Sequence, residues 1–354
     1  MTSADTGKPI YAPLSDRWRE WLAPLKKPML LYRSLQLVRC EFEITSGTDS
    51  APLPCLYIGE GLNLEYYRKL YGSAHCSPST PIPVWSLRAE IARARSRYPV
   101  TLVENNQLLD CLLPAGGLVT DPWIRQQTDL AGERYRLRQR GIERGVGRSV
   151  RIHNFQCRFS REARDLEAFY SAYYLPHIHA RHGTLAAGRS LAQLRKALRS
   201  GFLLQVWRGD RWVSGLVAER TTRERICPLV VGLHPAHLAA WQNGALAAGY
   251  YFLFRWAREN GVRIVDLGGS RPHLMDGVFH HKTLWASVAE RDPWHHTEIV
   301  FYLDPAVRLP SVVSQQLVWK QDRLLTIAES LPAAALTHCF DATAPSAGTP
   351  QATH

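Results

Sequence analysis

The stretch NGALAAGYYFLFRWARENGVRIVDLGGSRPHLMDGVFHHKTLWA, residues 243–286, decides the fold of this chain. Apolar residues recur at helical spacing through its first half. Gly261 follows them as a left-handed terminator would, which predicts a helix that ends near Asn260. The next residues, Val262 to Leu267, are rich in β-branched side chains and predict a strand that enters a tight turn at Gly268. This order predicts a site at the carboxyl end of the strand.

Further helices and strands precede this stretch. Two segments have the apolar spacing of amphipathic helices and three have the composition of strands, the first two of these joined by turn-forming residues at 208–211. The helices are expected at 165–175 and 191–200, and the strands at 202–207, 212–219 and 225–233. Two helices, an antiparallel meander, a helix and a further strand predict an α/β fold, of the α+β type with a mixed sheet, on which the long helix packs.

Six short motifs occur in the order known from one superfamily. They are Arg134 to Val146, Phe169-Tyr170, Arg181-His182-Gly183, Asn243 ahead of the long helix, Asp266 to Arg271, and Lys282 followed three residues later by Trp285. On these motifs, about half of the chain resembles the FemAB-like branch of the GCN5-related N-acyltransferase (GNAT) superfamily. The resemblance implies a GNAT-like acyltransferase fold with two units, of which the first is degraded or abbreviated.

The resemblance and the composition together suggest where the units begin and end. We expect an abbreviated N-terminal α/β unit at 1–133 and a complete acyltransferase domain at 134–330. That domain would contain a strand at 297–303 and a terminal helix at 312–330. The tail at 331–354 is rich in Ala, Thr, Pro and Ser and is expected to be disordered.

Two positions depart from the family pattern. His281 stands where the family usually has Phe before the lysine, and Ala286 stands where it usually has Gly after the tryptophan. In addition, the pyrophosphate loop of the wider fold is not cleanly present at 241–245. The resemblance therefore implies acyl transfer, with acyl-CoA as the expected co-substrate, no tightly bound cofactor, and aminoacyl-tRNA as the alternative donor.

The charge of the chain favours an anionic partner. Its formal net charge of +12 comes largely from Arg. Such a balance suits tRNA, a nucleotide-linked sugar, coenzyme A or an acidic membrane surface, and does not choose among them.

Cysteine usage and hydropathy suggest a cytoplasmic protein. The chain has seven Cys without paired close spacing, an odd number that favours reduced thiols. The first 13 residues lack an apolar signal core, and no apolar run reaches the length of a transmembrane helix.

Four residues of the opening stretch are candidates for catalysis. Acyl transfer to an amine needs a neutral amine, an aligned carbonyl and donors for the developing oxyanion. Asp266 could orient or deprotonate the amine, although an Asp at a strand end more often accepts hydrogen bonds from the following turn. His280 or His281 could serve as the base, and only one of them would face the site in an extended segment. Lys282 could stabilise the oxyanion or contact a phosphate.

Further residues are candidates for substrate binding. Arg271 and Ser270 follow the Gly-Gly turn, where a phosphate or carboxylate could be held, although an exposed Arg most often solvates a surface. Trp285 is expected in the core or the wall of the site. The resemblance adds Arg181 and His182 at the edge of the acceptor pocket, and Asn243 before the long helix.

Two other segments invite functional interpretations. The histidines at 177, 179 and 182 could bind zinc, but Pro176 and Gly183 predict a loop there and no matching carboxylates or cysteines have metal-site spacing, so no metal is expected. The basic run from Arg134 to Arg151 could follow a phosphate backbone or could simply be the solvated face of a helix. It lacks interleaved aromatic residues.

The resemblance therefore implies an enzyme, an N-acyltransferase. Its acceptor would be an amine on an amino sugar, a cell-envelope precursor or a small metabolite. The first alternative is transfer of an amino acid from aminoacyl-tRNA, with tRNA as a partner. The second is a catalytically silent module that binds an anionic ligand.

Overall fold

The computed structural model describes residues 35–45, 51–73, 76–106, 108–182, 188–237, 244–292 and 297–331. These residues form two compact units. Within the described part, unit 1 consists of Arg125–Ser270 and His280–Glu290, and unit 2 consists of 35–124, Arg271–Phe279 and 291–331. Both units mix helices with sheets, so the predicted α/β class is confirmed.

The division into units differs from a single boundary near residue 134. The strand β13 (Thr297–Leu303) has the predicted bounds, but it pairs antiparallel with β4 (Val100–Asn106) along its whole length. It therefore belongs to the sheet of unit 2 rather than to the domain expected at 134–330. Residues 332–354, which include most of the expected tail, lie outside the described residues.

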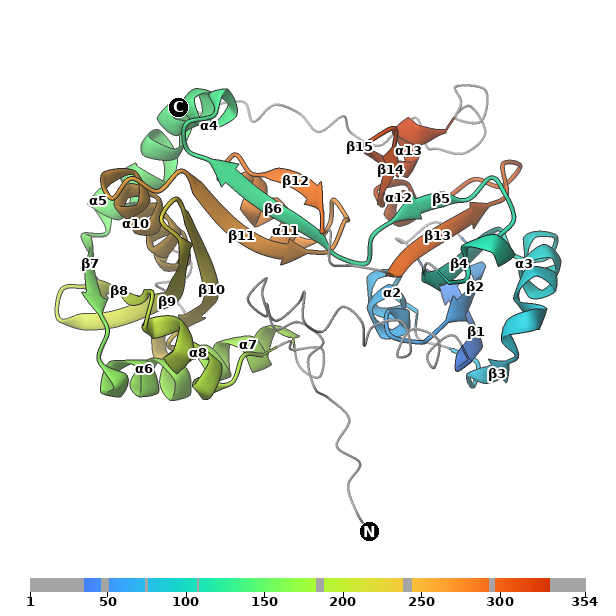
Figure 1. Cartoon of the computed structure of the whole chain (residues 1–354), viewed down its shortest axis with the longest axis horizontal. Coiled ribbons are helices and arrows are strands. Elements are labelled where there is room, and N and C mark those ends of the chain that lie inside the picture. The colour runs from blue at the N-terminus through green and yellow to red at the C-terminus, as the bar shows by residue number, and fades with distance from the viewer. Residues whose placement is uncertain are drawn as a thin grey trace, which may run out of the picture. The chain divides into compact units, whose positions relative to one another are not determined.

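Unit 1 is built on a seven-stranded mixed sheet, with strand order β12-β6-β11-β10-β9-β8-β7 (Figure 1). The strands are β6 (Ile124–Asp129), β7 (Phe155–Ser160), β8 (Phe202–Arg208), β9 (Arg211–Thr222), β10 (Arg225–Leu233), β11 (Ile264–Ser270) and β12 (Val288–Arg291). The predicted hairpin at 208–211 and the strands on either side of it are confirmed.

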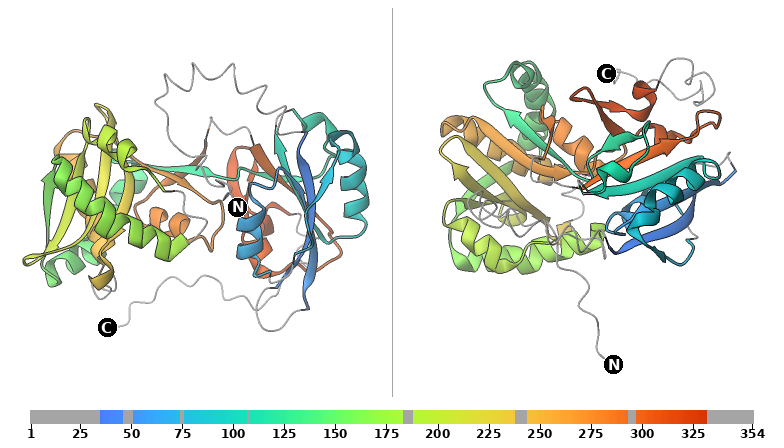
Figure 2. Two further views of the ribbon diagram at one scale, coloured as in Figure 1. Left: turned by 90° about the horizontal axis from the view of Figure 1, so that it is seen from below. Right: turned by 45° about the vertical axis from the view of Figure 1, so that its right-hand side comes forward.

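Helices cover both faces of this sheet, because side chains alternate between faces along each strand. Leu204 and Leu216 face a core formed with the helix α10, whereas Leu203 and Val217 face a second core on the opposite side. The first layer contains α4 (Glu133–Ile142), a π-helical turn (Glu143–Gly147), α5 (Arg148–Ile152) and α10 (Ala245–Glu259). The second contains α6 (Ala163–Phe169), a π-helical turn (Tyr170–Tyr174), α7 (Leu175–His182) and α8 (Leu191–Leu198) (Figure 2).

The long helix α10 ends as predicted, with Asn260 as its C-cap and Gly261 at a φ of 67°. The predicted loop at 177–183 is wrong for its described residues, because α7 runs to His182. Pro176 is tolerated there because the π-helical turn just before it widens the helix where a proline ring would otherwise meet the preceding turn.

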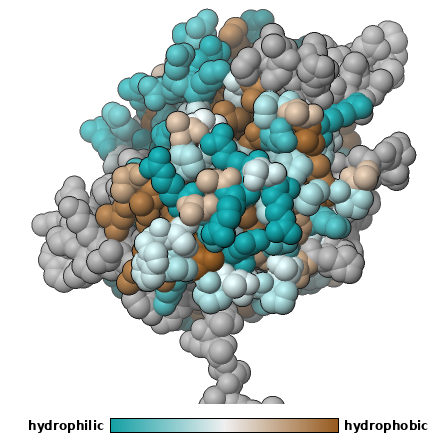
Figure 3. All heavy atoms as spheres, turned by 90° about the vertical axis from the view of Figure 1, so that its right-hand side faces the viewer, coloured by the Kyte–Doolittle hydropathy of each residue, from teal (hydrophilic) through white to brown (hydrophobic). Residues whose placement is uncertain are grey.

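Unit 2 contains an eight-stranded sheet with strand order β15-β14-β5-β13-β4-β2-β1-β3. Its further strands are β1 (Leu37–Ile44), β2 (Leu53–Gly59), β3 (Thr80–Ile82), β5 (Leu118–Thr120), β14 (Leu317–Lys320) and β15 (Arg323–Thr326), and its main helices are α2 (Leu64–Leu70) and α3 (Leu87–Arg95). Separate hydrophobic cores lie around Phe301 and Val300, neighbours that point to opposite faces of β13. On the face shown in Figure 3, hydrophobic residues occur in small groups among hydrophilic ones.

The predicted terminal helix at 312–330 is wrong. The segment forms the short helix α12 (Ser311–Ser314), the hairpin of β14 and β15, and the short helix α13 (Ile327–Ser330). The hairpin turn places Gln321 and Asp322 at φ values of 48° and 58°, so both turn residues adopt the left-handed conformation of a type I′ turn.

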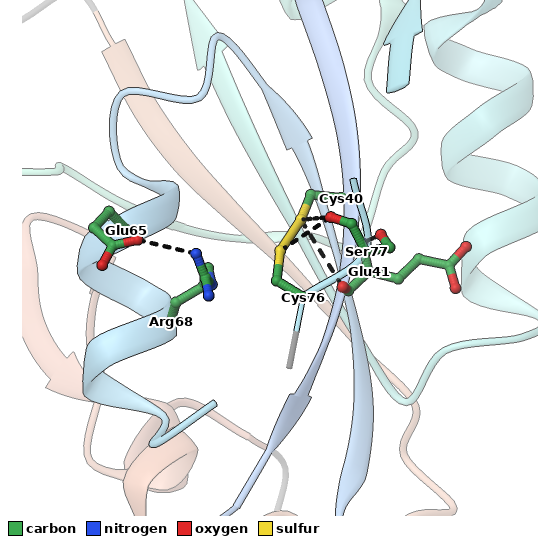
Figure 4. The surroundings of a disulfide bond; sticks show 6 residues. All are labelled: Cys40, Glu41, Glu65, Arg68, Cys76 and Ser77. Carbon is green, nitrogen blue, oxygen red and sulfur yellow. Dashed lines mark hydrogen bonds and ion pairs between the residues drawn. A yellow bond between two sulfur atoms is a disulfide. The ribbon is translucent and has the colours of Figure 1, made fainter. Parts of the chain in front are cut away.

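Two cysteines in unit 2 are joined, contrary to the expectation of reduced thiols. Cys40 of β1 and Cys76 form a disulfide whose Cα atoms lie 6.8 Å apart (Figure 4). Phe42, two residues from Cys40 on the same face of β1, forms an isolated antiparallel bridge with Cys76. This cross-strand register aligns the two sulfur atoms, and a sequence separation of 36 residues gave no sign of it.

Among the described residues, no helix combines the length and the apolar character needed to cross a bilayer.

Candidate active site

The candidate site of unit 1 begins where two parallel strands part. β10 and β11 pair only at Arg225 with Ile264 and at Ile226 with Val265. From Cys227 on one strand and Asp266 on the other, no residue of β10 is paired with a residue of β11, although both strands continue. A gap of this kind inside a sheet turns backbone N–H and C=O groups away from strand pairing.

Asp266 lies buried at the start of this divergence. Its Oδ2 accepts from Arg125 Nε at 3.0 Å, with a second short contact to Nη2 of the same guanidinium, and Arg225 Nη1 lies 3.5 Å away. Its Oδ1 accepts from the backbone N–H of Gly268 at 3.0 Å. The last contact is the hydrogen bond that an Asp at a strand end typically accepts from the following turn. The two arginines that hold the carboxylate are not predicted by the sequence.

Lys282 is buried beside the same strand. It lies on α11 (Gly277–Thr283), and its Nζ donates to the carbonyl oxygens of Gly268 at 3.0 Å and Gly269 at 2.5 Å. Consecutive carbonyls of a regular strand point in opposite directions, but Gly268 has a φ of 73°, which turns both toward one ammonium group. The strand therefore continues through Ser270 with this local distortion, where the sequence predicted that it would end in a turn.

The two adjacent histidines lie on a helix rather than in the expected extended segment. His280 is exposed, and His281 is half-buried, with its ring centroid 4.9 Å from that of Tyr250 on α10. Trp285 is fully buried between Tyr250 and Phe254, at centroid distances of 5.8 and 4.9 Å. The tryptophan is thus part of the core behind His281, as expected of a core or wall residue.

A chain of buried hydroxyl and amide groups fixes the end of β11. Ser270 Oγ donates to Gln126 Oε1 at 2.6 Å, and Gln126 Nε2 donates to Ser287 Oγ at 3.0 Å. Ser287 in turn donates to the backbone oxygen of Lys282 at 2.9 Å. Ser270 is completely buried, so its hydroxyl positions the strand and α11 relative to β6.

Cys227 stands on β10 where the strands separate. Burial raises the pKa of its thiol to about 12, with a further contribution from the carboxylate of Asp266. The residue as a whole is half-buried. Arg189, also half-buried, lies close enough to interact electrostatically with this thiol, and burial lowers the pKa of its guanidinium. This arginine was not predicted from the sequence, and it adds a positive charge on the β10 side of the site.

Arg271, the next residue after β11, lies in unit 2 and has protein partners. Its guanidinium donates to Asn63 Oδ1 at 2.6 Å and to the carbonyl oxygen of Pro122 at 2.8 Å. It lies 4.3 Å from the ring centroid of Tyr66 and 4.1 Å from that of Trp123. These contacts are those of a structural arginine.

The remaining predicted site residues are only partly covered by the structure. The backbones of Arg181 and His182 form the end of α7, and Asn243 lies outside the described residues. The described residues contain no cluster of three or more His, Cys, Asp or Glu side chains that could hold a metal ion.

No protein-family model and no curated protein matches the chain. Among solved structures, FemX matches at 12% identity over 73% of this chain and 83% of that chain, with a TM-score of 0.39. L-PGS from Bacillus licheniformis matches at 11% over 74% and 83%, with a TM-score of 0.36. A tandem GNAT protein from the clavulanic acid biosynthesis pathway matches at 9% over 81% and 93%, with a TM-score of 0.30.

The chain is similar to FemX and GNAT structures. These are the groups that its motifs resemble.

Proposed function

We propose that this protein is an N-acyltransferase that moves an acyl group directly from an acyl-CoA, or another acyl thioester, to an amine. The acceptor would be an amino sugar, a cell-envelope precursor or a small metabolite. The divergence of β10 and β11 after Ile226 and Val265 carries this proposal. An extended donor arm with amide groups, such as the pantetheine arm of an acyl-CoA, can pair with the backbone groups along the gap as an added strand would.

The proposed reaction needs no covalent enzyme intermediate. The amine nitrogen attacks the thioester carbonyl carbon, and a C–N bond forms while the oxygen becomes an oxyanion. The C–S bond then breaks, the thiolate leaves, and the proton lost by the amine passes to a base. Backbone N–H groups along the gap that are not used to pair β10 with β11 would stabilise the oxyanion. Because its pKa is raised to about 12, Cys227 stays protonated near neutral pH, which favours direct transfer over an acyl-cysteine intermediate.

The surrounding residues suggest how the roles are divided. His281 is the proposed base, because its half-buried imidazole packs against Tyr250, which is close enough to Cys227 on β10 to interact with it electrostatically. Asp266 is engaged by Arg125 and Arg225, so we assign it to positioning the strand rather than to proton transfer. The ammonium group of Lys282 donates to two carbonyl oxygens of β11, so we assign it, like Asp266, to positioning this strand.

A turnover assay with two donor classes tests the proposal. The purified protein would be incubated with acetyl-CoA and longer acyl-CoAs in the presence of a panel of amines. Thiol release and the mass of the acylated product would be measured. In parallel, aminoacyl-tRNA would be supplied, with and without ribonuclease treatment. Thiol release that depends on both amine and protein, and that falls in His281→Gln, supports the proposal.

The other outcomes identify the alternatives. Product formation only with aminoacyl-tRNA, abolished by ribonuclease, would replace the thioester by an aminoacyl ester as donor. Saturable binding of an anionic ligand without turnover with either donor would favour a binding module. An acylated Cys227 isolated after the reaction would overturn direct transfer.

A further inference from the structure

The solvent face of the segment from α4 to α5 carries a row of arginines. Arg136, Arg140, Arg144 and Arg148 follow one another at intervals of four residues, and all four are exposed. A four-residue repeat drifts around an α-helix by about 40° per step, because the helix has 3.6 residues per turn. The wider π-helical turn at Glu143–Gly147 offsets part of this drift, so the row stays on one side over about 18 Å.

These arginines are not used to stabilise the protein. Within the described residues, none of the four donates to a carboxylate or a backbone oxygen, and Glu143, the acidic residue among them, accepts instead from Tyr251 at 3.0 Å. Like charges four residues apart destabilise a helix. The opposite side of the helix, with Tyr135 and Val150, is packed into the core of unit 1 and holds the row in place.

The row borders a depression and two exposed apolar side chains. A cavity of about 630 Å³, open to solvent, is lined by Arg136, Gln139, Arg140, Glu143 and Arg144. Leu137 is 76% exposed among the arginines, and Ile152 is 63% exposed at the end of α5. An exposed leucine has no role against a phosphate backbone, but it suits the boundary between headgroups and acyl chains of a membrane.

We infer that this surface binds the anionic face of a lipid membrane. The guanidinium groups would contact lipid phosphates, the depression would seat a headgroup, and Leu137 would enter the acyl boundary. The absence of aromatic side chains among the four arginines argues against a platform for single-stranded nucleic acid. The inference is independent of the proposed acyl transfer, whose donor assay uses no membrane.

Vesicle binding with matched variants tests this inference. The full chain would be sedimented with vesicles of phosphatidylcholine alone or of phosphatidylcholine mixed with phosphatidylglycerol, at low and high salt. The test variant changes Arg136, Arg140, Arg144 and Arg148 to Gln. The control variant changes the same number of exposed arginines elsewhere on unit 1, namely Arg164, Arg199, Arg208 and Arg211. Circular dichroism would verify that both variants are folded.

We expect binding to the anionic vesicles only, weakened by salt. Each arginine near an anionic surface contributes roughly fivefold, so the test variant, which removes four, should lose about 600-fold in partitioning. The control should lose much less, and Leu137→Ser should weaken the binding that remains at high salt. Equal losses in both arginine variants would overturn the inference, as would wild-type binding to a short RNA duplex but not to vesicles.

Discussion

Replacing Lys282 by Met would test whether its ammonium group holds the end of β11. Met keeps most of the buried stem but removes the donor to the carbonyl oxygens of Gly268 and Gly269. Leaving a buried acceptor unsatisfied costs about 1–3 kcal/mol, and part of this is offset because no charge remains buried. We therefore expect unit 1 to lose about 2 kcal/mol of its free energy of unfolding.

Urea unfolding would measure this loss, and hydrogen exchange with mass spectrometry would locate it. Peptides that cover β11 should exchange faster in Lys282→Met, whereas peptides from β2 in unit 2 should be unchanged. Lys196→Met is the control, because Lys196 is exposed on α8 and should change stability by less than about 0.5 kcal/mol. If Lys282→Met unfolds like the wild type and β11 exchanges at the same rate, the two hydrogen bonds do not hold the strand.

Three further predictions concern unit 2. Burial raises the pKa of Asp121 to about 6, so stability associated with its proton is present at acid pH and is lost as pH rises from about 4 through 6. Asp121→Asn should reduce the fall of the thermal unfolding midpoint over this pH range. If the midpoint of the variant depends on pH as that of the wild type does, the raised pKa of Asp121 is contradicted. Reducing the disulfide of Cys40 should cost roughly 3 to 4 kcal/mol, from a loop that spans 36 residues, and Cys40→Ser should make stability insensitive to reductant. The account fails if the wild type is equally insensitive. Arg271→Lys should cost about 2 kcal/mol in urea unfolding, because lysine keeps the charge but loses the planar fork between two rings. A rise in KM at unchanged stability would instead make Arg271 a substrate ligand.

The sequence predicts those helices and strands in which apolar residues recur with a regular period within the element itself. The helix α10 and the strands β8, β9, β10 and β13 have regular periodicity, because each contributes apolar side chains to a hydrophobic core beside its sheet. The strand β6 was missed because two of its inward residues are Gln126 and Thr128. They are buried only because they bond to Ser270, Ser287 and the backbone of Trp285, all more than 140 residues away.

Part of the candidate site could not be predicted for the same reason, because its residues interact with partners that are far away in the sequence. Asp266 was visible as an acidic residue at a strand end, but its partner Arg125 lies 141 residues earlier in the chain. The sequence predicts a helix where β14 and β15 form a hairpin, because the turn uses Gln321 and Asp322 in left-handed conformations, without the glycine that usually signals such a turn. A residue's role cannot be predicted from the local sequence where it depends on a partner that is far away in the chain.

The pairing of β13 with β4 has a consequence for how the chain folds during its synthesis on the ribosome. The middle of the sheet in unit 2 is finished only after residue 297 emerges, when β13 enters between β4 and β5. Until then the inward edge of β4 and apolar side chains such as Tyr67, which packs on Phe301, lack their partners. Most of unit 1, by contrast, lies on the uninterrupted stretch from 125 to 270. During synthesis the first strands of unit 2 therefore have an unpaired edge until β13 is made, and such an edge can aggregate or bind a chaperone. Fragments truncated before residue 297 should be insoluble for the same reason.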